Sequence, residues 1–258
     1  MIKVAGPFGL VRRASVIAGL ALAIVVPQAS SAAPPNGASA HKVASARKTK
    51  VARPSRAKAA KGVQAPILLP PQSEPASRTI AWIAAEHDNG GLPYAVIDKQ
   101  AASLLLFSAK GAFIGQTPVL LGIGIGDDSS PGVGAKDLAD IGPAERTTPA
   151  GRFVAKFGRA FGRQRVLWVD YANSVALHAV ITTHKSEHRV ERLLSPTPDD
   201  NRISFGCINV GTKFYTGTLS PLFRKKGGVV YILPDTKSLD DVFPRVRLLP
   251  YVSAAATS

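Results

Sequence analysis

The sequence predicts a mainly β domain, a mixed-sheet sandwich with few short helices, between residues 76 and 258. Seven short apolar segments bounded by Gly, Pro, Asp or Asn have the length and composition of β-strands. One short segment of helical periodicity precedes them, and the charge distribution is that of a single domain behind a basic tail. The seven segments are Tyr94–Ile97, Leu104–Phe107, Phe113–Gly124, Arg152–Phe157, Val166–Val169, Val175–His178 and Val229–Leu233.

The net charge of +15 is concentrated in the first part of the chain. Residues 1–75 contain 11 of the 32 Lys and Arg residues but only one of the 17 Asp and Glu residues, a net charge of +10. Residues 76–258 therefore have a net charge of only +5. Because a nucleic-acid-binding domain carries its basic residues on the folded surface, we expect no nucleic-acid partner.

Residues 1–32 have the features of an export signal. Lys3, Arg12 and Arg13 form a positive start, a run of 13 apolar and small residues extends from Ala14 to Val26, and small residues suited to cleavage follow. An uncleaved anchor is the alternative, but a membrane-spanning helix needs ~20 apolar residues. We therefore expect an exported protein of the periplasm or cell envelope, without stable membrane insertion after cleavage.

Residues 33–75 have the composition of a disordered linker. Ala, Pro, Ser, Lys and Arg dominate, and the stretch from Lys42 to Lys61 contains eight basic residues and no acidic one. Such a segment buries too little apolar surface to fold. It is either an electrostatic tether to anionic polymers or lipids of the envelope or a solvated spacer.

The domain begins with a short helix. Ser77 is the expected N-cap of the segment Arg78–His87, in which Ile80, Ile83 and Ala84 share one face. The next four residues, Asp-Asn-Gly-Gly, tolerate left-handed geometry and end the helix. His87 lies in its last turn, where the helix dipole favours an imidazole, so we expect a structural role for it.

Two connections between the strands stand out. Ser108–Gly111 is a hairpin turn, whereas Gly122–Gly142 is rich in Gly, Asp and Ser and predicts a long surface loop. The glycines at 122, 124 and 126 superficially match a phosphate-binding loop. They have no following helix and no Gly-Lys-Ser/Thr, so a nucleotide site is excluded.

The segment Arg202–Val210, RISFGCINV, contains Cys207, the only cysteine of the chain. A single cysteine forms no intramolecular disulfide and cannot build a structural zinc site, so it is either a buried small hydrophobe of a strand or a reactive thiol. Gly206 directly precedes it. This arrangement leaves the backbone amides of Gly206 and Cys207 open to a developing oxyanion, which favours a nucleophile.

Three motifs together resemble the L,D-transpeptidase catalytic domain, also called the YkuD domain, of bacterial cell-wall enzymes. They are a TPxGxF turn at Thr148–Phe153, a strand ending in a histidine at Leu177-His178, and a Ser-Phe-Gly-Cys-Ile-Asn motif at Ser204–Asn209. The resemblance covers about Pro93 to Pro234, in the same order along the chain. It implies the mixed-sheet sandwich and a cysteine nucleophile.

The sequence departs from the family pattern at two places. Phe205 occupies the position of a second histidine, which removes a polar group beside the nucleophile. Between His178 and Ser204 lie 25 residues, more than the family's usual interval, so we expect an insertion between Ile181 and Ile203 that forms a lid or substrate wall.

Within that insertion, His188 is a rival to His178 as the general base. We prefer His178, since a strand end holds a base more rigidly than a charged loop does. His184 and His188 form an H-x-x-x-H pair that would bind zinc if it faced one way on a helix. The pair lacks the Glu of metalloprotease helices, and a solvated helix face is the preferred interpretation.

The resemblance implies cysteine acyl transfer on peptidoglycan stem peptides, without a metal or organic cofactor. His178 would deprotonate Cys207, and the thiolate would attack the L-centre of diaminopimelate and expel the terminal D-alanine. An amine acceptor makes the protein an L,D-transpeptidase, water makes it an L,D-carboxypeptidase, and loss of activity would leave a peptidoglycan-binding module. Arg202 and Asn209 are candidate substrate-binding residues, although Arg202 could instead pair with Asp199 or Asp200.

Overall fold

The computed structural model describes residues 68–160 and 164–250, and all seven predicted segments form strands in it. Two further strands, each of three residues, flank Cys207 and were not predicted, because so short a segment shows no alternation. The nine strands are β1 Tyr94–Asp98, β2 Ser103–Phe107, β3 Phe113–Gly122, β4 Gly151–Arg159, β5 Arg165–Asp170, β6 Val175–Ala179, β7 Arg202–Ser204, β8 Ile208–Val210 and β9 Gly228–Ile232.

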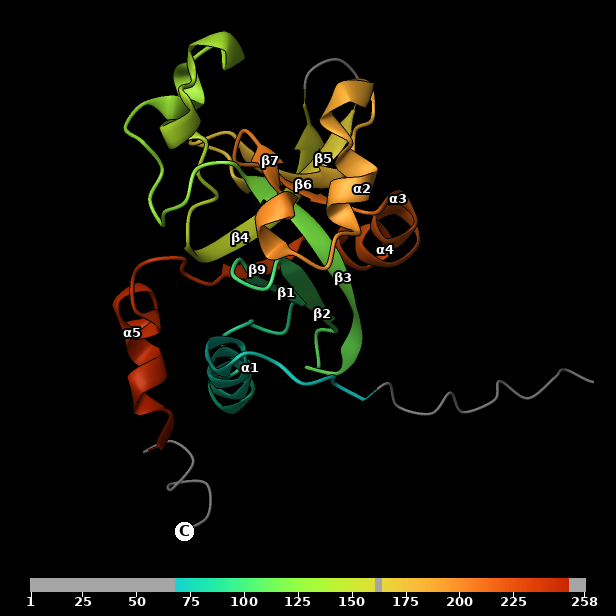
Figure 1. Cartoon of the computed structure of the whole chain (residues 1–258). Coiled ribbons are helices and arrows are strands. Elements are labelled where there is room, and N and C mark those ends of the chain that lie inside the picture. The colour runs from blue at the N-terminus through green and yellow to red at the C-terminus, as the bar shows by residue number, and fades with distance from the viewer. Residues whose placement is uncertain (1–67, 161–163, 251–258) are drawn as a thin grey trace, which may run out of the picture. The chain divides into compact units, whose positions relative to one another are not determined.

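The strands form one mixed sheet in the order β2-β1-β9-β4-β5-β6-β8-β3-β7. Strand β3 also pairs with β2, so the sheet closes on itself and β7 is added outside this ring. The pairs β1–β9, β6–β8 and β3–β7 are parallel, and the remaining pairs are antiparallel. The mainly β, mixed-sheet prediction is therefore confirmed, and the long β3 links the two ends of the sheet (Figure 1).

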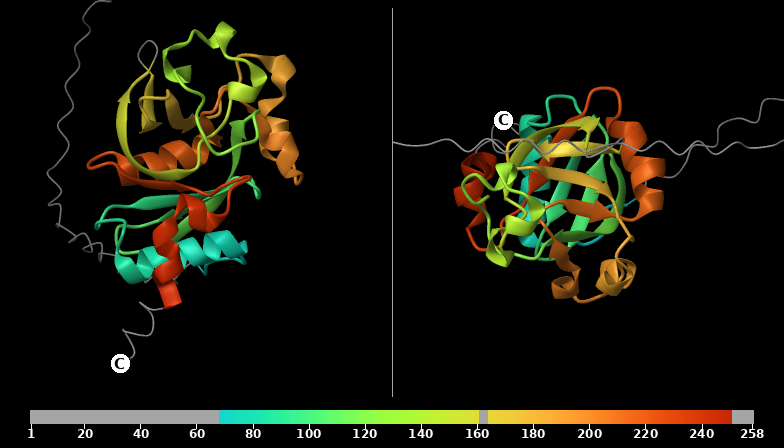
Figure 2. Two further views of the ribbon diagram at one scale, coloured as in Figure 1. Left: turned by 90° about the vertical axis from the view of Figure 1, so that its left-hand side faces the viewer. Right: turned by 90° about the horizontal axis from the view of Figure 1, so that it is seen from above.

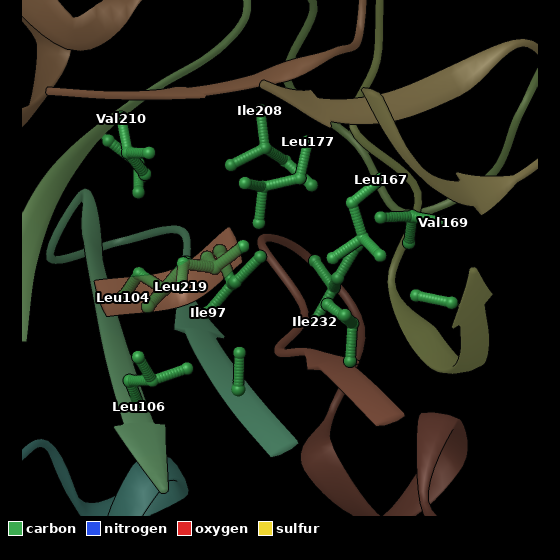
Figure 3. Packing of buried hydrophobic residues seen from close by; sticks show 14 of the residues in the cluster. Ile97, Leu104, Leu106, Leu167, Val169, Leu177, Ile208, Val210, Leu219 and Ile232 are labelled. Atoms are coloured by element: carbon green, nitrogen blue, oxygen red, sulfur yellow. The ribbon is translucent and has the colours of Figure 1, made fainter. Parts of the chain in front are cut away.

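Alternation along the strands separates two apolar clusters. In β2, Leu104 and Leu106 point into the closed sheet, whereas Leu105 and Phe107 belong to the outer cluster. The inner cluster joins buried residues from eight of the strands, all except β7, with three side chains of the helical segments, Tyr215, Leu219 and Phe223. Figure 3 shows the packing of part of this cluster, including Leu219. Both faces of β2 are buried, which explains why its apolar run is continuous rather than alternating.

The outer cluster is covered by helix α1, Glu74–Glu86, and α5, Leu239–Val242, which lie at the same end of the sheet (Figures 1 and 2). Helix α1 begins four residues earlier than predicted. Its N-cap is Ser73, not Ser77, and the Ser73 hydroxyl accepts a hydrogen bond from the amide of Ala76 at 3.2 Å. Trp82 and Ile83 are buried on this helix, whereas Ala84 is exposed and does not belong to the buried face.

The remaining helical elements are short. They are α2 Arg189–Leu193, α3 Thr212–Phe214, α4 Ser220–Phe223, the π-turn Tyr215–Leu219, and the 3-10 segments Val133–Ala135, Leu138–Asp140, Pro143–Glu145, Lys185–Glu187, Pro198–Asn201 and Pro244–Leu248. Among the described residues, no helix is both long enough and apolar enough to cross a membrane. The predicted export signal, 1–32, and residues 33–67 of the predicted linker lie outside the described residues.

Candidate active site

The turn between β7 and β8 holds Cys207 in place. The Ser204 hydroxyl donates a hydrogen bond to the carbonyl oxygen of Cys207 at 2.6 Å and accepts one from the amide of Gly206 at 3.1 Å. The side chain of Ser204 thus bridges the two ends of the turn Ser204–Cys207. Ser204 therefore shapes the backbone on which the thiol is mounted, which is the kind of local side-chain bond that stabilises turns.

Gly206 occupies a backbone conformation that requires glycine. Its φ is +116°, and a Cβ at this position would lie 2.6 Å from the carbonyl oxygen of Thr147. The Thr148 hydroxyl donates to the carbonyl of Gly206 at 2.9 Å and accepts from the amide of Gly122 at 2.9 Å. Thr148 of the TPxGxF turn and the preceding Thr147 thus pack directly against the cysteine turn, so two of the sequence motifs lie in contact.

Hydrogen bonding in this turn corrects the expectation for the oxyanion site. The amide of Gly206 already donates to Ser204 and is not open, contrary to the prediction. Within residues 68–160 and 164–250, no acceptor contacts the amide of Cys207. Of the two amides that the sequence singled out, the amide of Cys207 is therefore the one that remains open to an oxyanion.

The thiol of Cys207 is half-buried and lies 3.6 Å from the carbonyl oxygen of Ser174. Burial raises the pKa of Cys207, because a thiolate is poorly solvated there, while hydrogen bonding to the backbone of Ala176 and the charge of Arg189 oppose this rise. The net effect is a pKa above the ordinary value. The resting side chain is consequently a thiol that must lose a proton before it can attack.

His178 lies near the C-terminal end of β6, beside the cysteine motif. The parallel pairing of β6 with β8 aligns Leu177 with Ile208 and His178 with Asn209. The Nδ1 atom of His178 is 2.8 Å from the carbonyl oxygen of Ala179, an acceptor, so Nδ1 carries the hydrogen and Nε2 is left as the base. Burial lowers the pKa of His178, which keeps the imidazole neutral.

The rival histidines lie elsewhere. The side chain of His188 is 68% exposed and lies 3.7 Å from Glu191, and His188 does not line the cavity that contains Cys207. His184 precedes the 3-10 segment, and His188 has a φ of 49° that separates this segment from α2, so the two imidazoles do not share one helix face. No group of three or more metal-ligating side chains is present in the described part of the chain.

Two cavities meet at Cys207. The smaller, about 360 Å³, lies against the loop between β3 and β4, and the larger, about 860 Å³, extends over β5 and β6. Cys207 and Phe205 line both, whereas His178, Asn209 and Arg189 line only the larger. Cys207 therefore borders a cavity on each of two sides, and His178, the candidate base, lines one of these cavities.

Phe205 forms a wall between the sheet and the long loop. The guanidinium of Arg146 lies 3.9 Å from the centre of the Phe205 ring, within the range of a cation–π contact. The same guanidinium donates from Nε to the carbonyl oxygen of Ile141 at 2.9 Å. The phenylalanine thus anchors the loop beside Cys207, a packing role that the sequence motif did not indicate.

The wall opposite the thiol comes mainly from the predicted long loop rather than from the predicted insertion. Val133, Leu138 and Ile141 of this loop line the smaller cavity, and Leu138 also lines the larger. From the insertion, only Ile181 and Arg189 reach a cavity. The loop and α2 lie at the same end of the sheet (Figures 1 and 2). The lid or substrate wall expected from the insertion between Ile181 and Ile203 is thus formed mainly by the loop between β3 and β4.

The prediction for Arg202 as a substrate clamp is wrong. Its guanidinium forms a bidentate ion pair with Asp235, at 2.6 and 3.0 Å, and neither Asp199 nor Asp200 is its partner. The Asp235 side chain is 3% exposed and also lies 3.2 Å from the buried ammonium of Lys99. Arg202 lines neither cavity and serves to neutralise a buried carboxylate.

Asn209, the second predicted substrate-binding residue, is fully buried between two active-site side chains. Its Oδ1 accepts a hydrogen bond from Arg189 at 3.0 Å, and its Nδ2 lies 3.4 Å from Nε2 of His178. Arg189 itself was missed. Arg189 lies in the charged stretch that the sequence analysis interpreted as a solvated helix face. No local pattern distinguishes it from Arg192, one turn later.

No protein-family model matches the sequence, and no curated protein is significantly similar to it. Solved structures with a similar arrangement include the LD transpeptidase LdtMt1 in complex with imipenem, 14% identical over 55% of this chain and 58% of that chain, with a TM-score of 0.34. An L,D-transpeptidase from Mycobacterium smegmatis is 15% identical over 54% and 58%, with a TM-score of 0.31. The catalytic domain of the E. faecium L,D-transpeptidase is 15% identical over 55% and 96%, with a TM-score of 0.32. The chain thus spans a little over half the length of the first two structures.

Proposed function

We propose that this protein is a cysteine acyltransferase of the L,D-transpeptidase type that acts on peptidoglycan stem peptides, with Cys207 as nucleophile and His178 as general base. The observation that carries the proposal is the parallel pairing of β6 and β8, which brings His178 into the same cavity as the only thiol of the chain. The three sequence motifs, in family order, supply the substrate class.

The first half-reaction forms a thioester. The Nε2 atom of His178 takes the thiol proton, and the sulfur of Cys207 attacks the carbonyl carbon at the L-centre of diaminopimelate. The tetrahedral intermediate collapses when the C–N bond to D-alanine breaks, and the imidazolium returns the proton to the leaving amine. Before attack, the sulfur has to turn away from the carbonyl of Ser174, its present contact.

The second half-reaction transfers the acyl group to an amine of another stem. That amine attacks the thioester carbonyl and gives a proton to His178. The C–S bond then breaks, and His178 returns the proton to the sulfur, which restores the thiol of Cys207. In both halves the amide of Cys207 is the donor nearest the developing oxyanion, and one such donor typically contributes ~3 kcal/mol. No oxidation state changes, so the reaction needs no cofactor.

Two other outcomes use the same site. Water in place of the amine would give an L,D-carboxypeptidase, with no change in the residues involved. Phe205 favours a peptidoglycan-binding module without turnover, because it replaces a histidine of the family motif with an apolar wall against both cavities. The export signal predicted over residues 1–32 would place either activity in the periplasm or cell envelope.

Mass spectrometry of the purified protein tests the proposal. After incubation with a stem tetrapeptide or a carbapenem, we expect a covalent adduct confined to Cys207. The Cys207→Ala variant should form no adduct and no product, while its stability falls by only ~1 kcal/mol for the lost sulfur. Binding without acylation by the wild type would favour the module, and product formation by Cys207→Ala at the wild-type rate would overturn the nucleophile assignment.

A further inference from the structure

Arg189 is the one basic side chain that lines the larger cavity from the inserted segment. It is the first residue of α2, its side chain is only 12% exposed, and it shares the cavity with Cys207 and His178. The guanidinium of an arginine keeps its charge in proteins. The cavity thus contains a permanent positive charge that neither the sequence motifs nor the proposed reaction uses.

Hydrogen bonds connect Arg189 to His178 through Asn209. The Nη1 of Arg189 donates to Oδ1 of Asn209 at 3.0 Å. A guanidinium only donates, so it requires the oxygen of the Asn209 amide on its own side and directs the amide nitrogen toward His178. That nitrogen lies 3.4 Å from Nε2, where a donor is compatible only with an unprotonated ring nitrogen. The contact of Nδ1 with the carbonyl oxygen of Ala179 and the contact of Nε2 with Asn209 therefore favour the same tautomer of His178, in which Nδ1 carries the hydrogen.

The charge of Arg189 acts on both members of the proposed catalytic pair. It lowers the pKa of Cys207 against the larger effect of burial, and it adds to the effect of burial that lowers the pKa of His178. The charge thereby favours the thiolate of Cys207 and keeps the resting imidazole of His178 neutral, although it also disfavours the imidazolium. Glu187 accepts from Nε of Arg189 at 2.6 Å and partly offsets this charge from the solvent side.

Other charged groups around the two cavities contribute less to the sulfur's environment. Lys136 and Glu145 line the smaller cavity but form an ion pair with each other at 2.6 Å, and Asp137 lies beside them on the exposed loop. Arg159 is an exposed residue at the rim of the larger cavity, and Arg146 lies against Phe205. Of these groups, none contacts Asn209 or His178 in the described part of the chain.

We propose that Arg189 is a positioning residue for acyl transfer: through Asn209 it holds His178 in the tautomer with Nε2 unprotonated, and its charge stabilises the thiolate of Cys207. This inference rests on the proposed function in taking Cys207 as the nucleophile and His178 as the general base. The inserted segment thus supplies the active site with its charge, a different role from the substrate wall expected of it.

The rate of alkylation of Cys207 by iodoacetamide, followed against pH on the full chain, tests the electrostatic part without any substrate. Since the chain has one thiol, the measurement reports on Cys207 alone. Arg189→Gln should shift the profile to higher pH and slow alkylation at pH 7 about 10-fold, as a shift of one pKa unit would. Arg189→Lys keeps a charge and should restore most of the rate. Arg192→Gln is the matched control on the same helix, since Arg192 donates to the carbonyl of Asp200 instead, and should leave the profile unchanged.

Steady-state kinetics with a stem peptide separates positioning from substrate binding. Arg189→Gln should lower kcat and leave KM nearly unchanged. A raised KM with an unchanged alkylation profile would mean that Arg189 binds a substrate carboxylate and would overturn the proposal. Should Arg189→Gln fail to fold, Glu187→Gln gives the opposite test: it leaves the charge of Arg189 unopposed, so the profile should move to lower pH, and an upward shift would refute the inference. If the wild type alkylates but forms no peptide adduct, the proposed function fails and the alkylation test of Arg189 still stands.

Discussion

Burial acts in opposite directions on the two residues that would exchange a proton. It raises the pKa of the Cys207 thiol and lowers the pKa of the His178 imidazole, so both are neutral near pH 7. Because Cys207 and His178 are both neutral at rest, neither of them attracts a charged substrate group electrostatically. In the proposed reaction, proton transfer from Cys207 to His178 would accompany the arrival of the acyl carbonyl, whose oxygen takes over the negative charge of the sulfur.

At the residue scale, the buried histidine should make stability depend on pH. The folded pKa of His178 lies below the ~6.5 of an unfolded histidine, so the unfolded state binds more protons as the pH falls. Its stabilising contribution is therefore complete above pH ~6.5 and is lost as the pH falls through the folded pKa. Urea unfolding at pH 7 and pH 5 should show a smaller loss in His178→Gln than in the wild type. Equal losses would contradict the assignment, and His87→Gln, at an exposed position, is the control.

The choice of general base is a second prediction at this scale. His178→Gln should lower turnover by ~10²- to 10⁴-fold, the usual contribution of a positioned base, because among the described residues no other imidazole lines the cavity of Cys207. His188→Gln should leave turnover unchanged, since its side chain is 68% exposed. Initial rates with a stem tetrapeptide provide the measurement. A large loss in His188→Gln alone would move the base into the inserted segment.

At the scale of single elements, the turn between β7 and β8 determines where the thiol of Cys207 lies. Its conformation depends on Gly206, whose positive φ and contact with Thr147 leave no room for a side chain. The two strands that flank it have only three residues each, so they have little pairing of their own with which to resist a change in the turn.

Gly206→Ala should therefore lower both stability and activity. We expect a loss of ~1–3 kcal/mol in the free energy of unfolding from backbone strain, and a larger fractional loss of turnover because Cys207 moves with the turn. Gly211→Ala is the matched control: Gly211 lies just after β8, has a negative φ, and a Cβ there meets no atom within 4 Å. Denaturant unfolding and initial rates are measured on both variants. Equal stability and equal turnover of Gly206→Ala and Gly211→Ala would show that the turn tolerates a side chain at position 206.

At the scale of the whole molecule, a buried ionic network ties the long loop to the sheet. Lys99, in the turn after β1, donates to the carbonyls of Gly126 and Thr148 at 2.7 and 2.9 Å, and to Asp127 at 2.8 Å. Burial alone would raise the pKa of Asp127, but the hydrogen bonds from Lys99 and from the backbone at Asp235, Lys237 and Thr236 lower it below the ordinary range. The network thus joins both ends of the loop to the segment that follows β9.

Removal of the ammonium should unfold this junction. Lys99→Met leaves Asp127 and Asp235 buried with too few positive partners, and breaking a buried pair in this way typically costs ~3–5 kcal/mol. Lys110→Met, at an exposed hairpin position, should change stability by less than ~0.5 kcal/mol. Thermal unfolding of both variants checks the difference. A Lys99→Met protein as stable as the control would mean that the network contributes nothing to the junction.

Truncation tests where the folded part begins. Deletion of residues 34–67 should leave the melting temperature unchanged but weaken retention on isolated wall sacculi and abolish the salt dependence of that retention, as expected for a basic tether. Deletion of residues 34–75 also removes Ser73, the N-cap of α1, whose hydroxyl donates to Asp98 at 2.6 Å. The longer deletion should lower stability by ~1 kcal/mol or more. An equal melting temperature for both truncations would show that the cap is dispensable, and a large drop with the shorter one would refute the tether.

The sequence alone predicted the features that depend on local pattern. The seven longer strands follow from short apolar runs between turn residues, and the hairpin turn Ser108–Gly111 joins β2 to β3 as expected. Cys207 is recognised as special because it is the only thiol and follows a glycine. Burial and turn chemistry are encoded within a few residues, so no tertiary information was needed for them.

Only the tertiary structure decided which polar groups meet. Arg202 pairs with Asp235, 33 residues away, and Arg189 reaches Asn209, 20 residues away. The amide of Gly206 is occupied by the hydroxyl of Ser204, which the sequence cannot reveal because it depends on the turn's dihedral angles. The sequence around a charged side chain looks the same whether that side chain is solvated or buried against a distant partner. Which partner it meets depends on the pairing of strands that are far apart in the sequence, and a local pattern does not contain that information.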